Sequence, residues 1–129
     1  MGALTYQYDY GLGRVLNLPV CDRDHYMSAW RVWSLLLRKH PEAPYLKPAQ
    51  GAVLEHLHQG PATRGVFCNI SVGGGKTLIA LLAPHAANAK RPLLLVPNGL
   101  EDEFERQYNI WSEHYPVVRS RILTYSDRS

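Results

Sequence analysis

Apolar residues recur along this chain at two different periods, which distinguish its predicted helices from its predicted strands. Over residues 22–40 they return every three or four positions, as Tyr26, Trp30, Trp33 and Leu37 do. This spacing predicts an amphipathic helix. The same reasoning, with proline near the start and glycine or proline near the end, predicts further helices at residues 48–59, 76–83 and 100–115.

Short runs that are apolar throughout lie between these helices. The runs cover residues 65–70, 91–97 and 120–126, and a further stretch at residues 4–10 alternates tyrosine with polar residues. Strands that alternate with helices and are apolar on both sides are typical of a parallel sheet with helices on both faces. We therefore predict an α/β fold, with residues 65–70 as its first buried strand.

Composition narrows the class of protein only a little. The chain has 129 residues, a net charge of +3 and a hydrophobic share of 46%. These values fit one globular domain, and the charge permits a polyanionic partner without requiring one. No apolar run is long enough to span a membrane, and the first residues lack the pattern of a secretory signal. Cys21 and Cys68 are far apart and predict reduced thiols, hence a cytoplasmic location.

Three glycines followed by Lys-Thr stand between the first predicted buried strand and the helix after it. Glycines at a helix amino terminus let backbone amides curl around an anion, a lysine adds a positive charge, and a threonine hydroxyl can bind Mg²⁺. This arrangement predicts a phosphate-binding P-loop, with Thr77 as the metal-binding residue. Its predicted members are Ser71, Val72, Gly73, Gly74, Gly75, Lys76 and Thr77.

The P-loop pattern departs from the general one at a single position. The pattern G-x-x-x-x-G-K-[ST] places glycine where this chain has Ile70. Two alternatives follow: a glycine-rich turn that merely precedes Lys-Thr, and a P-loop protein of another class, such as a small-molecule kinase.

Four segments together resemble the beginning of a superfamily 2 helicase or Swi/Snf-type translocase. They are "YLKPAQGAVLEHL", "NISVGGGKTLIALLAP", "KRPLLLVPNGLEDEFERQ" and "SRILTYSD", and they span residues 45–127. The segment "LAPHAANAKRPLLLVP" is similar to helicases encoded by bacteriophages. The resemblance implies an incomplete RecA-like nucleotide-binding domain over residues 45–129, preceded by an extension, a short strand and a helix, over residues 1–44.

The resemblance also implies cofactors, partners and roles for single residues. ATP and Mg²⁺ would be the cofactors, and nucleic acid, DNA in preference to RNA, would be a partner. Gln50 would read the adenine edge, for which its amide has both a donor and an acceptor. The implied contacts to the nucleic-acid backbone are Pro97, Asn98, Gly99, Thr124 and Tyr125. The alternatives are an exposed helix glutamine at Gln50 and an ordinary buried strand at residues 120–126.

Two further features bear on the resemblance. Trp33 precedes Gln50 at an interval similar to that of an adenine-stacking aromatic residue, but its helical spacing favours a place in the core. The Asp-Glu pair of a Walker B motif is not found, since Arg128 follows Asp127 where a glutamate is needed. Catalysis is therefore expected of the intact family protein and not of these 129 residues alone. Truncation, a split product completed by another chain, and a non-catalytic binding module all stay open.

Overall fold

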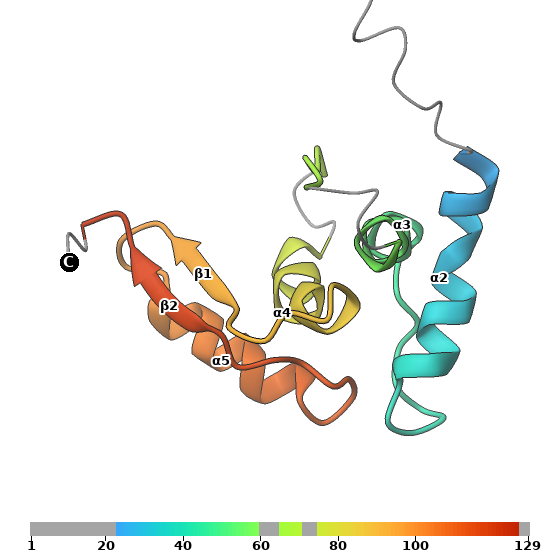
Figure 1. Ribbon diagram of the computed structural model, residues 1–129. Coiled ribbons are helices and arrows are strands. Elements are labelled where there is room, and N and C mark those ends of the chain that lie inside the picture. The colour runs from blue at the N-terminus through green and yellow to red at the C-terminus, as the bar shows by residue number, and fades with distance from the viewer. Residues whose placement is uncertain (1–22, 60–64, 71–74, 127–129) are drawn as a thin grey trace, which may run out of the picture.

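The computed structural model describes residues 23–59, 65–70 and 75–126 of the chain (Figure 1). This part of the chain has an α/β architecture of four helices and one two-stranded parallel sheet. In chain order the elements are α2 (Arg23–Leu37), α3 (Pro48–His58), α4 (Lys76–Ala86), β1 (Leu93–Val96), α5 (Glu101–Trp111) and β2 (Arg121–Thr124). The predicted strand at residues 4–10 lies outside the described residues.

The sheet confirms the predicted parallel pairing of the last two strands. β1 and β2 run in the same direction, with Leu93 opposite Arg121 and Val96 opposite Thr124. Helix α5 connects them, as parallel strands require a crossover between their ends. The carboxyl ends of both strands therefore lie on the same side of the sheet, together with the turns that follow them. We call this side the carboxyl edge of the sheet, as distinct from the free edge of a strand.

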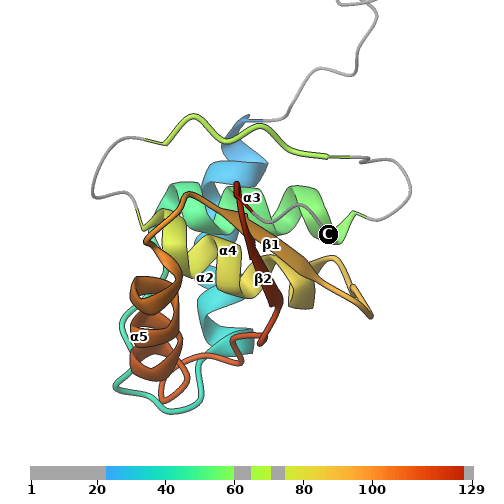
Figure 2. The same ribbon diagram turned by 90° about the vertical axis from the view of Figure 1, so that its left-hand side faces the viewer.

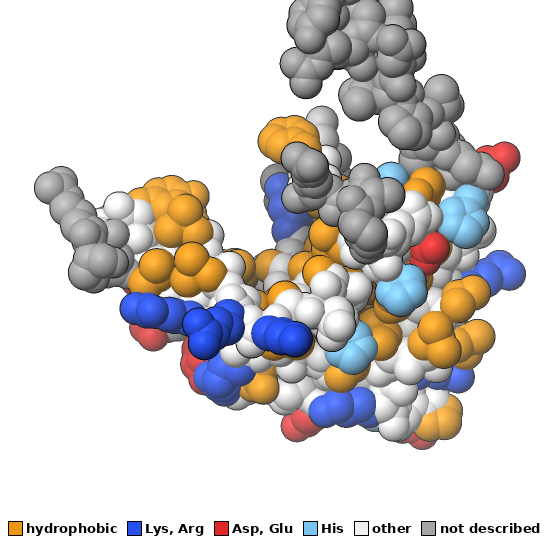
Figure 3. All heavy atoms as spheres, in the orientation of Figure 1, with side chains coloured by type: hydrophobic (Ala, Val, Ile, Leu, Met, Phe, Trp, Pro, Cys, Tyr) orange, Lys and Arg blue, Asp and Glu red, His pale blue; other side chains and the backbone are white. Residues whose placement is uncertain are grey.

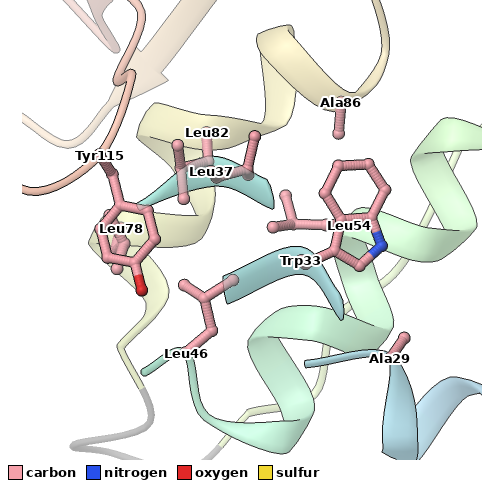
Figure 4. Close-up of a cluster of buried hydrophobic side chains, with 9 residues drawn as sticks. All are labelled: Ala29, Trp33, Leu37, Leu46, Leu54, Leu78, Leu82, Ala86 and Tyr115. Atoms are coloured by element: carbon pink, nitrogen blue, oxygen red, sulfur yellow. The ribbon is translucent and has the colours of Figure 1, made fainter. Parts of the chain in front are cut away.

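The three helices α2, α3 and α4 pack through one hydrophobic cluster (Figure 4). Its residues are Ala29, Trp33, Leu37, Leu46, Leu54, Leu78, Leu82, Ala86 and Tyr115. Of the predicted amphipathic face of α2, Trp33 and Leu37 belong to this cluster and the half-buried Trp30 packs against it, while Ala29 is a member that the prediction did not name. Trp33 belongs to this cluster, and its Nε1 donates a hydrogen bond to Glu55 Oε2 at 2.7 Å, which satisfies its polar atom. Trp33 is thus a core residue, as its spacing favours.

Helices α2 and α3 approach each other closely because of a glycine. A side chain at Gly51 would overlap the backbone of Trp30 on α2. Gly51 is buried. Glycine has a lower helical propensity than alanine, but only glycine leaves room for this close contact.

Tyr115 and the turn around it bind the loop between α2 and α3. The hydroxyl of Tyr115, a fully buried residue, donates to the carbonyl oxygen of Pro44, and burial raises the pKa of this tyrosine. Lys39 donates its backbone N–H to His114 and its Nζ to the carbonyl oxygen of Ser112, at 2.8 and 2.7 Å. The core therefore joins residues on both sides of the predicted domain boundary between residues 44 and 45.

The predicted buried strand at residues 65–70 is wrong. These residues have no regular secondary structure, and the side chain of Phe67 is 96% exposed. Figures 1 and 2 both show the segment apart from β1 and β2. No described strand lies beside it to pair with its backbone, and an apolar run without a neighbour cannot be buried in a sheet.

The expectation of helices on both faces of the sheet is also wrong for the described residues. On one face, Leu94 and Ile122 approach Phe104 and Tyr108 of α5. On the other face, Leu93 and Leu95 of β1 are exposed large hydrophobic residues.

Helix boundaries differ from prediction at two places. Helix α4 continues through Pro84 to Ala86, although Pro84 lacks the N–H that would bond to the carbonyl oxygen of Ala80. Helix α5 ends at Trp111, and a turn then carries Tyr115 into the core. No helix in the described ranges has the length and apolar character that crossing a membrane requires.

Candidate functional site

The predicted phosphate site lies at the amino end of α4. Gly75 is the residue before the helix and has a φ of 80°, in the left-handed region that glycine adopts without strain. Lys76 and Thr77 are the first residues of the helix, and Lys76 is exposed. The amides of a first helical turn have no partner within the helix, so they are available to an anion. The other predicted members, Ser71, Val72, Gly73 and Gly74, lie outside the described residues.

The charge around this helix end favours an anion. Helix α4 has no acidic residue in its first turn, and Lys76 adds a positive charge to the positive end of the helix dipole. A phosphate at this position would therefore meet no carboxylate from the helix itself.

Gln50 is in direct contact with this junction. Its side chain is buried at 4% exposure, and its Nε2 donates to the carbonyl oxygen of Gly75 at 3.0 Å. Its Oε1 accepts the backbone N–H of Lys47 at 2.7 Å, as a residue in the first turn of α3 can. The structure thus brings together two predicted site segments that are 25 residues apart in the sequence.

Gly75 is required by this contact as well as by its backbone conformation. A Cβ atom at position 75 would overlap Nε2 of Gln50. The amide of Gln50 therefore holds the end of the loop at a fixed place against α3. Both ends of this amide bind backbone atoms here, so the predicted role of Gln50 in reading adenine stays a prediction.

Sequence reasoning missed the contact between Gln50 and Gly75. The spacing "KPAQ" is a signal for the other contact of Gln50, with Lys47, because a glutamine three residues after the position before a helix commonly turns back to the backbone. The pattern gave no indication that the same side chain would also reach the start of α4.

The metal prediction depends on Thr77 alone within the described part of the chain. Thr77 is partly buried, and its hydroxyl is the one predicted Mg²⁺ ligand. Across residues 23–59, 65–70 and 75–126, no group of three or more His, Cys, Asp or Glu side chains could hold a metal ion. Mg²⁺ bound at a P-loop also uses phosphate oxygens and water, so a single hydroxyl is compatible with that mode of binding.

The predicted nucleic-acid contacts gather at the carboxyl edge of the sheet. Pro97, Asn98 and Gly99 follow β1, and Oδ1 of Asn98 accepts the backbone N–H of Ser126, after β2, at 3.2 Å. Thr124 at the end of β2 is buried, whereas Tyr125 is 65% exposed. The structure therefore leaves Tyr125 open to a ligand and uses the side chain of Asn98 to join the two turns.

The amino end of α5, beside these residues, carries the opposite charge to that of α4. Glu101, Asp102 and Glu103 occupy its first turn. Hydrogen bonds from Arg106 and Gln107 lower the pKa of Glu103, so its carboxylate stays charged to more acidic pH than usual. These carboxylates repel a nucleic-acid phosphate near Gly99 and make Tyr125 the stronger candidate for a contact at this edge.

The one free cysteine among the described residues is a poor candidate nucleophile. Cys68 lies in the segment of residues 65–70, and partial burial raises the pKa of its thiol. A raised pKa keeps the thiol protonated at neutral pH, which lowers its reactivity.

Comparison with known proteins finds no match for this chain among protein-family models, curated proteins or solved structures.

Proposed function

We propose that the chain is the nucleotide-binding front end of an ATP-dependent helicase or translocase, with a RecA-like arrangement around its P-loop. The observation that supports this most is the contact between Gln50 and Gly75. It places the two segments that the resemblance assigns to adenine and to phosphates beside each other at one helix end. The positive φ of Gly75 is equally typical of a glycine-rich turn of no function, so the support comes from the contact and not from the φ.

ATP fits the residues at this helix end. The amides of the first turn of α4 would bind the phosphate chain, Lys76 would pair with its terminal oxygens, and the Thr77 hydroxyl would face the Mg²⁺. The metal, when bound, withdraws charge from the phosphate oxygens. The proposed activity of these 129 residues is binding and not hydrolysis, because the sequence offers no Asp-Glu pair at the end of a strand.

A series of nucleotides with shorter phosphate chains tests the proposal. We expect Mg·ATP and Mg·ADP to bind in calorimetric titrations of the full chain, and AMP to bind at least about tenfold more weakly, a difference of about 1.4 kcal/mol. The physical reason is that AMP lacks the phosphates that Lys76 and the α4 amides would hold. Equal binding of all three nucleotides would show that Lys76 and the α4 amides do not bind the additional phosphates.

Nucleic acid is the second ligand of the proposed function, with DNA preferred. The exposed ring of Tyr125 at the carboxyl edge of the sheet offers a surface on which a base can stack. Stacking of one base on an aromatic side chain contributes about 1–3 kcal/mol. Tyr125→Ala should therefore weaken binding of a single-stranded oligonucleotide by roughly fivefold or more, as measured by fluorescence anisotropy at fixed salt.

The matched control for that experiment is Tyr45→Ala, which removes another exposed tyrosine far from the sheet edge. We expect this control to bind as the unchanged chain does. An equal loss in both variants would remove the proposed contact at Tyr125.

A further inference from the structure

One unexplained feature of the described surface is a hollow between α4 and the start of β1. Figure 3 shows the molecule hollowed between the part that holds the sheet and the helical part, with apolar side chains on the floor. The residues that line the hollow include Ala80 and Ala83 of α4, Ala87 directly after the helix, and Pro92 and Leu93 on the side of β1.

The first two residues of β1, Leu93 and Leu94, line the hollow, together with Ser120 before β2. Within the described residues β1 pairs with β2 alone, so its other edge has unpaired backbone N–H and C=O groups. Leu93 and Leu95 of the same strand are 59% and 60% exposed. A free strand edge with exposed apolar side chains is a template for pairing with another extended segment.

The floor of the hollow is suited to the close approach of a backbone. Ala80 and Ala83 are three residues apart and lie on one face of α4, and Ala87 follows as the residue that caps the helix. Their side chains are the smallest that still promote a helix, and they leave room for a strand with larger side chains to lie across them. The hollow therefore has the parts that an added strand needs, an edge for its backbone and a floor for one of its faces.

The helix beneath the hollow decides which kind of strand can enter. An added strand would lie with one face against α4, so that face of the strand cannot be covered by a helix of its own polypeptide. In this chain the Leu94 face of β1 is already covered by Phe104 and Tyr108 of α5.

A second copy that paired antiparallel through the same edge of β1 would turn its Leu94 face toward α4 and bring its own α5 into the space that α4 occupies. A second copy that paired in parallel would turn its bare Leu93 face toward α4, but it would place its own Lys90 and Arg91 beside those of the first copy, and these like charges repel.

The charged residues at one end of the hollow indicate which charge the partner segment carries. Lys90 and Arg91 precede β1, and Arg121 begins β2 directly opposite Leu93. All three are exposed, and none forms a salt bridge with another residue in the described ranges. Figure 3 shows basic side chains gathered along one border of the part that holds the sheet. A carboxylate at the matching end of an added strand would find these charges unpaired.

We infer that the hollow binds an extended apolar segment of a different polypeptide, which adds to the sheet at the edge of β1. The segment has one face bare of helices and an acidic residue at the end that lies beside Lys90 and Arg91. This inference does not depend on nucleotide binding at α4.

Synthetic nine-residue peptides with a core of valine and isoleucine test the inference. Four peptides carry two glutamates or two lysines at either the amino or the carboxyl end, and a fifth repeats the best binder with alternate amides N-methylated. We expect one glutamate peptide to bind the full chain about tenfold more tightly than the lysine peptide of the same design, in fluorescence anisotropy. N-methylation should abolish binding, because it removes the backbone donors that pair with β1.

Variants of the chain locate the peptide. Ala83→Phe fills the floor and should abolish binding, whereas Val32→Phe, at an exposed position of α2, should leave it unchanged. The double variant Lys90→Glu and Arg91→Glu should reverse the preference from glutamate to lysine peptides. The inference is wrong if no peptide binds, if the N-methylated peptide binds as well as its parent, or if Ala83→Phe has no effect. Self-association of the chain that Ala83→Phe abolishes would identify a second copy as the occupant and would also overturn it.

Discussion

Replacing Lys76 with alanine is expected to weaken the binding of Mg·ATP by roughly ten- to hundredfold. Lys76 is the first residue of α4, is exposed and would pair with the phosphate chain through a charge-assisted contact. Contacts of this kind contribute about 1.5–3 kcal/mol, which corresponds to that loss in affinity. Calorimetric titration of the two proteins with Mg·ATP measures the difference.

Lys90→Ala is the matched control for this experiment. Lys90 is exposed like Lys76, but it precedes β1 and has no place in the proposed phosphate site. We expect it to bind Mg·ATP as the unchanged chain does. If the two alanine variants bind equally well, the affinity comes from general positive charge and the P-loop assignment fails.

The largest loss of stability is expected from Leu82→Ala. Leu82 is fully buried in the cluster that joins α2, α3 and α4. Removing its side chain leaves a cavity among these helices, and such substitutions lower the free energy of unfolding by about 2–5 kcal/mol. Urea unfolding followed by circular dichroism gives this value directly.

Leu36→Ala is the same chemical change at a position where no cavity results. Leu36 lies on α2 with 70% of its surface exposed, so we expect its free energy of unfolding to change by no more than about 0.5 kcal/mol. Similar losses in both variants would mean that Leu82 is not buried as described.

The sequence allowed the helices and the pairing of the last two strands to be predicted. Of the predicted face of α2, Trp33 and Leu37 are buried and Tyr26 and Trp30 are half-buried, because a helix with one apolar face turns that face toward the core. The two apolar runs on either side of α5 predict a parallel pair for the same kind of reason. Local patterns gave correct predictions where the period of the apolar residues in a segment determines what the segment packs against.

A local pattern could not show that residues 65–70 form no strand. Its apolar run has the composition of a buried strand, but burial also needs paired neighbours, and the described residues provide none. The exposed face of β1 has the same cause, since Leu93 and Leu95 are apolar whether or not anything covers them. Such features depend on which strands and helices lie beside a segment in the whole sheet, and the pattern of a short stretch of sequence does not show these neighbours.

The candidate site was predicted in its members but not in its connections. Lys76 and Thr77 open α4 as the motif requires, and Asn98 lies beside the turn after β2. The hydrogen bond from Gln50 to Gly75 was not foreseeable, because it depends on how closely α3 approaches the start of α4.

The central claim is that nucleotide phosphates bind at the amino end of α4. Its most direct test is a titration of the ¹⁵N-labelled chain with Mg·ATP, followed through the backbone amide resonances, with adenosine as the reference ligand. We predict that the largest shifts that ATP causes and adenosine does not are at Gly75, Lys76 and Thr77, with a smaller change at the side-chain amide of Gln50. Unchanged resonances at these residues while ATP shifts others, or equal shifts with adenosine, would contradict the claim.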